Sequence, residues 1–106
     1  MANDWAADVK IYAPAADDDA IAGLLKTYRL VMSDRDSAYV ALSDAKERET
    51  VKANFLKKKL GLTEGDDKLD AALDEVAQVM KADRTKSRIT VYYLLAEKFG
   101  KLDLFR

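Results

Sequence analysis

The side chains best suited to chemistry lie near the C-terminal end, in the cluster Arg84, Lys86, Ser87 and Arg88. Asp83 is a suitable N-cap, so the cluster would occupy the first turns of a helix. A helix N-terminus offers free N–H groups and a favourable dipole to an anion. Because Arg84 and Arg88 are four residues apart, both would reach one phosphate. The alternative is that Arg84 pairs with Asp83 or with the end of the preceding helix.

A second cationic cluster consists of the lysines of one predicted helix: Lys52, Lys57, Lys58 and Lys59. At about 100° per residue, Lys52 and Lys59 fall inside the apolar arc formed by Val51, Phe55, Leu56 and Leu60. Either the lysine stems cover apolar surface, or the helix shares its face between two neighbours. A nucleic-acid patch is a third interpretation, but the formal net charge of −1 provides no overall attraction for polyanions.

Two absent residue types exclude whole classes of site. Without cysteine the chain has no disulfide, thiolate–zinc site, iron–sulfur cluster or cysteine nucleophile. Without histidine it lacks the commonest general base and transition-metal ligand. Residues 17–19, three consecutive aspartates, suit a first helical turn better than a metal site, because their carboxylates point in different directions. We expect no catalytic residue, metal or cofactor, with catalysis by Asp, Glu, Lys, Tyr or Ser left open.

Hydrophobic spacing predicts helices along almost the whole chain. Trp5, Val9 and Tyr12 share one face of a short N-terminal helix within residues 1–13, which ends before Pro14. Residues 33–43 predict a turn and a short helix. The other predicted helices cover residues 17–32, 44–60 and 66–80, and a central buried helix lies within 81–102.

Terminal residues mark several of these boundaries. Asp44 with Glu47 forms a capping box, and Asp66 or Asp67 is the expected cap of the following helix. Gly61 fits the left-handed position after a helix. Within the last helix, the β-branched and aromatic run 89–93 also suits a strand. The apolar pattern continues to Gly100 and no partner strand is evident, so a helix is favoured, with Tyr92 and Tyr93 in the core rather than in a stacking platform.

The two clearest apolar stripes match at an offset of 48 residues. The stripe 21–32 corresponds to 69–80, Asp34-Arg35 corresponds to Asp83-Arg84, and Gly61 corresponds to Gly100. The chain therefore predicts one all-α domain, residues 1–106, of about five to six helices. It would consist of the N-terminal helix and two pseudo-repeated helix–elbow–helix units, residues 17–62 and 66–105, which close on one core.

Two segments carry a resemblance to a known family. FLKKKLGL at residues 55–62 and YYLLAEKFGKLD at residues 92–103 resemble a family of short bacterial proteins classed as a domain of unknown function. The N-terminal helix is also similar, so the resemblance extends over nearly the whole chain. It implies an all-helical bacterial protein and transfers no catalytic or binding residue.

Two functional hypotheses remain. The first is a non-enzymatic module that binds a protein partner or associates with itself, because a complete core pattern accompanies no catalytic set. The second is binding of nucleic acid or a phosphate ligand through Lys57–Lys59 and Arg84–Arg88. The N-terminus lacks a signal-type apolar core and no run approaches about 20 apolar residues, so we expect a cytoplasmic protein outside the membrane.

Overall fold

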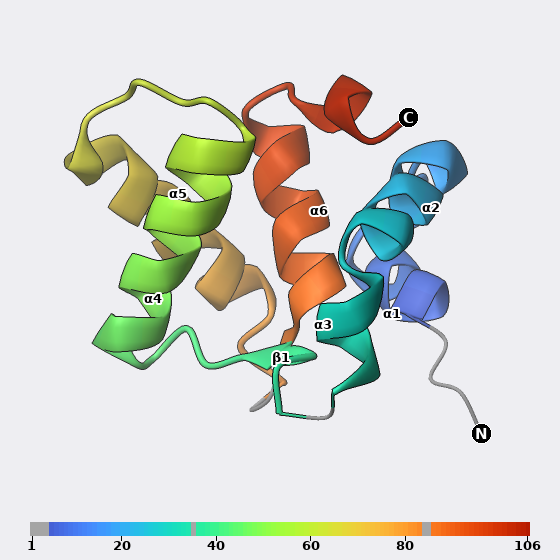
Figure 1. The fold of residues 1–106 in the computed structure, drawn as a ribbon. Coiled ribbons are helices and arrows are strands. Elements are labelled where there is room, and N and C mark those ends of the chain that lie inside the picture. Colours follow the sequence, from blue (N-terminus) through green and yellow to red (C-terminus); the bar gives the residue numbers. More distant parts are fainter. Residues whose placement is uncertain (1–4, 35, 84–85) are drawn as a thin grey trace.

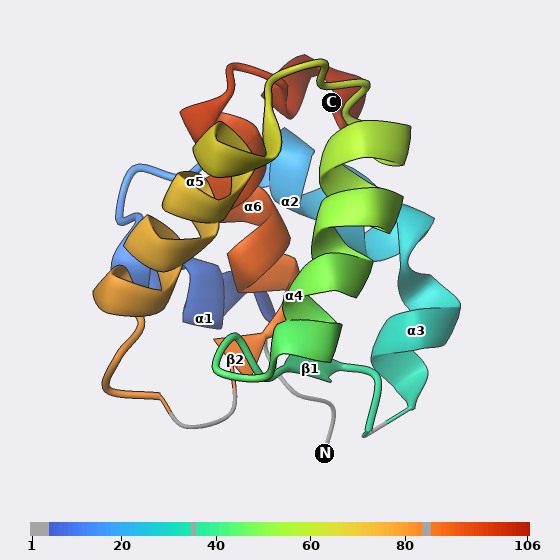
Figure 2. The ribbon, with the colours of Figure 1, turned by 90° about the vertical axis from the view of Figure 1, so that its left-hand side faces the viewer.

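Helix α6 (Arg88–Lys98) runs through the centre of the molecule and is enclosed by the other helices (Figures 1 and 2). Its buried residues point in every direction around the axis, and they are Ile89, Thr90, Val91, Tyr92, Tyr93, Leu95 and Ala96. A helix that is apolar all round belongs inside a protein. This confirms that 89–93 is helical and that the chain folds as one all-α domain.

The computed structural model describes residues 5–34, 36–83 and 86–106. The helices around α6 are α1 (Trp5–Tyr12), α2 (Asp18–Thr27), α3 (Arg29–Ser33), α4 (Ala45–Val51) and α5 (Asp66–Val79). The π-helix η1 (Lys52–Lys59) continues α4, and the 3₁₀ turn η2 (Leu102–Leu104) follows α6. The strands β1 (Tyr39–Val40) and β2 (Lys86–Ser87) form a two-stranded antiparallel sheet.

Several predicted helix boundaries are confirmed. The Asp17 carboxylate accepts hydrogen bonds from the N–H groups of Asp19 and Ala20, at 2.9 and 3.2 Å, and so caps α2. Asp44 caps α4 through the Lys46 N–H at 2.9 Å. Gly61 and Gly100 both have φ of 67°, which is the left-handed region where glycine ends helices at little cost.

Other boundaries differ from the prediction. Helix α5 begins after Gly65 with no side-chain cap, so neither aspartate of its first turn serves as the N-cap. Helix α6 begins at Arg88 and is capped by Ser87, not by Asp83. The reason is tertiary. Because Lys86 and Ser87 are extended in β2, the helix cannot start before them.

The prediction of a short helix in residues 33–43 is wrong. Between Asp36 and Ser43 the structure has turns and strand β1, which pairs Tyr39 with Ser87. The Arg88 N–H extends this pairing by donating to the Ala38 carbonyl at 2.8 Å. The two elbows therefore meet at the foot of α6, a contact between residues almost 50 positions apart that no local pattern reveals.

The stripe 21–32 is divided between two helices. Tyr28 has φ −109° and ψ 24°, which interrupts the helical path between α2 and α3. Met32, on the far side of this break, is still buried. The interruption turns α3 aside from α2 while both keep apolar residues on the core.

The π-helical geometry of η1 explains why Lys52 and Lys59 fell inside the apolar arc of the predicted helix 44–60. The buried residues Val51, Phe55, Leu56 and Leu60 stand four or five positions apart, whereas an α-helical stripe repeats at three and four. A π-helix hydrogen-bonds to the fifth residue, as the Leu60 N–H does to the Phe55 carbonyl at 2.8 Å. The wider turn brings all four residues to one face and moves the lysines to its edges.

Gly23, inside α2, permits a close approach of the C-terminal segment. A Cβ on Gly23 would stand 1.5 Å from the Phe105 carbonyl oxygen. Phe105 is buried, and Arg106 pairs with Asp17 beside it. The end of the chain is thus held on α2.

The internal duplication stays a prediction. Met32 and Met80 are both buried, and a left-handed glycine, Gly61 or Gly100, follows the long second helix of each unit. Arg35 and Arg84, the arginines of the two predicted elbows, lie outside the described residues.

Candidate functional site

Four rings form an aromatic cluster that joins the surrounding elements to α6: Tyr28, Phe55, Tyr92 and Phe105. The rings of Phe55 and Tyr92 stack with centroids 3.8 Å apart. Tyr28 meets Tyr92 edge-on at 5.0 Å, and Phe105 lies 6.1 Å from Phe55. Such ring–ring contacts stabilise the fold beyond the contribution of the apolar area that the rings bury. The cluster therefore fixes η1, the α2–α3 junction and the C-terminus against the central helix.

Arg88 is tied into this cluster. Its Nε donates to the Ser37 carbonyl at 2.6 Å and its Nη1 to the Tyr92 hydroxyl at 2.8 Å. Burial raises the pKa of Tyr92, while the Arg88 guanidinium acts in the opposite direction. Arg88 thus bridges the first elbow and α6 with two of its donors.

The other members of the predicted anion site also contact the protein itself. Lys86 is nearly buried, and its Nζ donates to the Asp83 carbonyl at 2.6 Å. The Ser87 hydroxyl accepts from the Thr90 N–H. Arg84 lies outside the described residues. Among the members that are described, every polar side chain has an internal partner.

The structure divides the predicted basic patch. Lys52 is buried between Glu49 and Asp70, at 2.9 and 3.0 Å. Hydrogen bonds to these two carboxylates raise the pKa of Lys52 to about 12. Next to this pair, Arg48 contacts Asp74 at 2.8 Å. Lys52 therefore clamps α4–η1 against α5 and does not belong to the exposed group.

The three consecutive lysines are exposed, but differ in their contacts. Lys57 pairs with Asp66 at 2.8 Å, and this contact lowers the pKa of Asp66. Lys59 lies over the Phe105 ring at 5.6 Å, a cation–π distance. Lys58 has no ion-pair partner among residues 5–34, 36–83 and 86–106.

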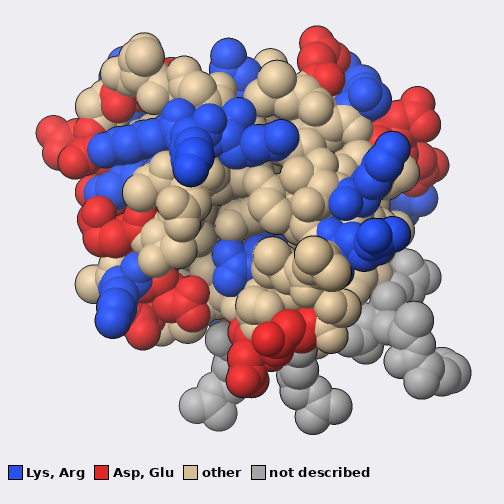
Figure 3. Space-filling model, viewed as in Figure 1, with Lys and Arg blue, Asp and Glu red and all other residues tan. Residues whose placement is uncertain are grey.

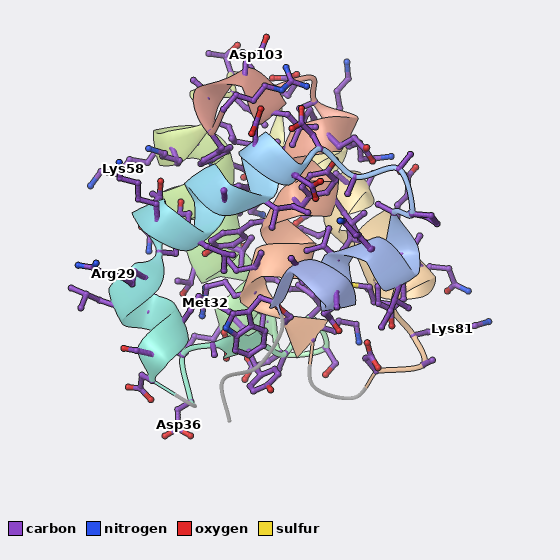
Figure 4. The ribbon with its side chains drawn as sticks, turned by 90° about the vertical axis from the view of Figure 1, so that its right-hand side faces the viewer. Arg29, Met32, Asp36, Lys58, Lys81 and Asp103 are labelled. Atoms are coloured by element: carbon purple, nitrogen blue, oxygen red, sulfur yellow. The ribbon has the colours of Figure 1, made fainter. Side chains whose placement is uncertain are left out.

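One face of the molecule combines these cations with exposed apolar surface. Figure 3 shows it hollowed near the centre, with Lys and Arg side chains gathered above the hollow and to one side. Figure 4 shows Lys58 and Arg29 extending outward on the same side of the molecule. Arg29 has no ion-pair partner in the described part of the chain, and the adjacent Leu30 is 80% exposed. We call Arg29, Leu30, Lys58 and Lys59 the cationic face.

Helix spacing missed this face because its members come from two separate helices of the first unit. Lys58 and Lys59 belong to η1, whereas Arg29 and Leu30 belong to α3. The sequence did contain one signal. Leu30 is a large apolar residue that falls between the stripe positions 28 and 32 and so off the apolar face of the helix.

A second surface feature is a groove of about 240 Å³ between α5 and α6. Its apolar lining consists of Val76, Val79 and Leu94, and its charged lining consists of Glu75, Glu97 and Lys98. Lys98 is engaged by Glu75 in an ion pair. Glu97 is exposed at the edge, so the groove is apolar inside with an acidic border.

The comparisons place the chain in a family. A family model matches residues 4–103, almost the whole chain. The chain belongs to DUF2853, whose description is "Protein of unknown function". This confirms the resemblance inferred from residues 55–62 and 92–103. No curated protein matches this DUF2853 chain.

Within the described ranges, no three His, Cys, Asp or Glu side chains are grouped so as to hold a metal ion. No helix in the same ranges is long and apolar enough to cross a membrane.

Proposed function

We propose that this DUF2853 protein is a non-enzymatic binding module that docks an acidic, partly apolar protein segment on its cationic face. The observation that carries the proposal is that Arg29 and Lys58 extend on the same side of the molecule (Figure 4), with the exposed Leu30 next to Arg29 in the chain. An apolar anchor ringed by charge is the usual anatomy of a protein contact.

The state of the cations supports this choice of face. Arg48, Lys52, Lys57 and Lys98 are held in ion pairs with α5 or its neighbours. Arg29 and Lys58 have no such partner among the described residues, so they keep their charge available to an incoming carboxylate. Cations at the border of an interface raise the association rate and select acidic partners.

Nucleic acid is supported less well. Single strands bind where bases stack on exposed aromatic rings inside a positive groove. Phe55 and Tyr92 are 1% and 4% exposed, and their faces are covered by each other. Lys52 and Lys57 are neutralised by carboxylates. What remains is a small group of cations without a stacking surface.

The experiment is fluorescence anisotropy with a labelled helical peptide rich in Glu and Leu. The double variant Arg29→Glu/Lys58→Glu should weaken binding at least about tenfold. Lys81→Glu is the charge control, because Lys81 extends from the opposite side of the molecule (Figure 4). It should leave the affinity within about twofold.

Two results would contradict the proposal. One is an equal loss in Lys58→Glu and Lys81→Glu, single variants with the same change in net charge, which would show attraction by overall charge. The other is tighter binding of a single-stranded oligonucleotide than of the peptide, with an affinity that falls steeply as salt is raised.

A further inference from the structure

The α5–α6 groove matches the cationic face in both polarity and charge. Val79 is 54% exposed at this groove and Leu30 is 80% exposed on α3. The groove is bordered by Glu75 and Glu97, whereas Leu30 follows Arg29. Lys98 pairs with Glu75 in the groove, which leaves Glu97 as the acidic side chain opposite in sign to Arg29.

The acidic character extends along α5. This helix contains five carboxylates and a single lysine in the sequence DDKLDAALDEVAQV. Four of the five already form ion pairs, with the partners Lys57 for Asp66, Lys52 for Asp70, Arg48 for Asp74 and Lys98 for Glu75. Glu97, on α6 beside the groove, is exposed. A cationic side chain brought to the groove would therefore meet the Glu97 carboxylate at its edge.

The two surfaces lie on different sides of the molecule. Figures 1 and 2 both place α3 and α5 apart, with α6 between them. One chain therefore cannot bring its own α3 to its own groove. Contact between these surfaces requires a second copy.

We infer that the α5–α6 groove binds α3 of a second copy of this chain, with Leu30 inserted and Arg29 facing Glu97. The inference rests on the proposed function and names the partner of the cationic face. The groove is smaller than the roughly 300–1,000 Å³ of small-molecule sites, which suits one anchoring side chain.

The geometry makes the contact head-to-tail. Because the two surfaces differ, the interface is heterologous, and each copy keeps a free α3 at one end and a free groove at the other. A short helix set into a shallow groove buries less than a standard interface, so the association is weak and depends on concentration.

The test is sedimentation velocity of the whole chain across a wide concentration range. The mean mass should rise with concentration and fall when salt is added. Leu30→Asp removes the apolar anchor of α3, and Val79→Asp places a charge in the α5–α6 groove. Each variant should remain monomeric. Leu104→Asp is the matched control at a third exposed apolar residue, 52% exposed, and should associate like the parent chain.

Mixing the two monomeric variants gives the decisive result. The Val79→Asp chain keeps an intact α3 and the Leu30→Asp chain keeps an intact groove, so one parental contact forms. An equal mixture should therefore give dimers and nothing larger. Recovery in the mixture also shows that neither variant failed because it was unfolded.

Three outcomes overturn the inference. The first is a monomeric parent chain at all concentrations. The second is a mixture that stays monomeric. The third is association that Leu30→Asp abolishes but Val79→Asp leaves unchanged, which would indicate an α3–α3 dimer. If the acidic peptide still binds a chain that stays monomeric, the proposed function stands and only this inference falls; if neither is seen, both fall.

Discussion

The ring of Phe55 lies flat against the ring of Tyr92, with planes 8° apart and centroids 3.8 Å apart. Phe55 comes from the π-helix and Tyr92 from the central helix, 37 positions later in the chain. Both residues are buried, so this contact joins the two units inside the core. It also holds the hydroxyl of Tyr92 where Arg88 donates to it.

Replacing each ring separates packing from hydrogen bonding. Phe55→Ala should lower the free energy of unfolding by about 3–5 kcal/mol, because it leaves a cavity beside Tyr92. Tyr92→Phe keeps the stack and removes only the bond from Arg88, so its cost should be about 1 kcal/mol. Urea unfolding followed by circular dichroism measures both. Equal losses in the two variants would show that the stack is not what stabilises this region.

The π-helix should tolerate a deletion that an α-helix cannot. Removing the exposed Ala53 places the buried residues of η1 at three, four and eight positions after Val51, which is an α-helical stripe. We expect this variant to unfold cooperatively and to keep its helical signal. Deleting the exposed Ala71 from α5 is the control, because it moves Leu69 out of phase with the buried residues that follow.

Thermal unfolding followed by circular dichroism compares these two deletions. The Ala71 deletion should lose several kcal/mol, since large core side chains cost about 2–5 kcal/mol each when lost. A greater loss on deleting Ala53 than on deleting Ala71 would contradict the explanation of η1 by residue spacing.

Gly23→Ala should destabilise the protein despite the better helix propensity of alanine. At an open helical position this change stabilises by about 0.5–1 kcal/mol. Here the new methyl group would collide with the carbonyl oxygen of Phe105. Removing residues 105–106 removes the collision, so the same substitution should stabilise the truncated chain. A double-mutant cycle measures this reversal, and an unchanged sign in both backgrounds would exclude the contact.

Alkaline pH should weaken the fold through Lys52 and Tyr12. Hydrogen bonds to Glu49 and Asp70 raise the pKa of Lys52 from 10.5 to about 12, and the bond to Asp83 raises that of Tyr12 from 10.0 to about 12. For a raised pKa, the stabilisation is complete below the unfolded value and disappears as pH rises through the folded value. Stability should therefore decline between about pH 10 and 12.

Two variants test whether Lys52 and Tyr12 cause this loss of stability at high pH. Lys52→Met retains an apolar stem and should flatten the pH dependence of the unfolding free energy in this range. Tyr12→Phe should remove a tyrosinate absorbance change near the pKa of about 12. A parent-like profile in both variants would show that other groups are responsible.

Replacing Leu95 and replacing Phe99 should differ in cost, although both belong to the apolar pattern that continues to Gly100. Leu95 is fully buried in α6, whereas Phe99 at its end is only partly buried. Leu95→Ala should cost about 2–5 kcal/mol, and Phe99→Ala less than Leu95→Ala. Urea denaturation checks the order, and the reverse order would show that the C-terminal end of α6 carries the packing.

Local patterns were sufficient for much of the fold. The stripes at α2 and α5, the caps Asp17 and Asp44, and the left-handed Gly61 all depend on residues within a few positions of one another. Helix periodicity and capping act over such distances, so they can be interpreted without a structure. The length of the apolar run around Tyr92 correctly favoured a helix over a strand.

The sequence by itself determined the fold class, the central helix and the absence of cysteine and histidine chemistry. Only the tertiary structure decided that Lys86 and Ser87 pair with the first elbow, that Lys52 is buried, and that Arg29 and Lys58 share a face. The physical reason is distance along the chain. A side chain's partner decides whether its charge is structural or available, and these partners lie from about 20 to about 50 positions away, where no periodicity connects them.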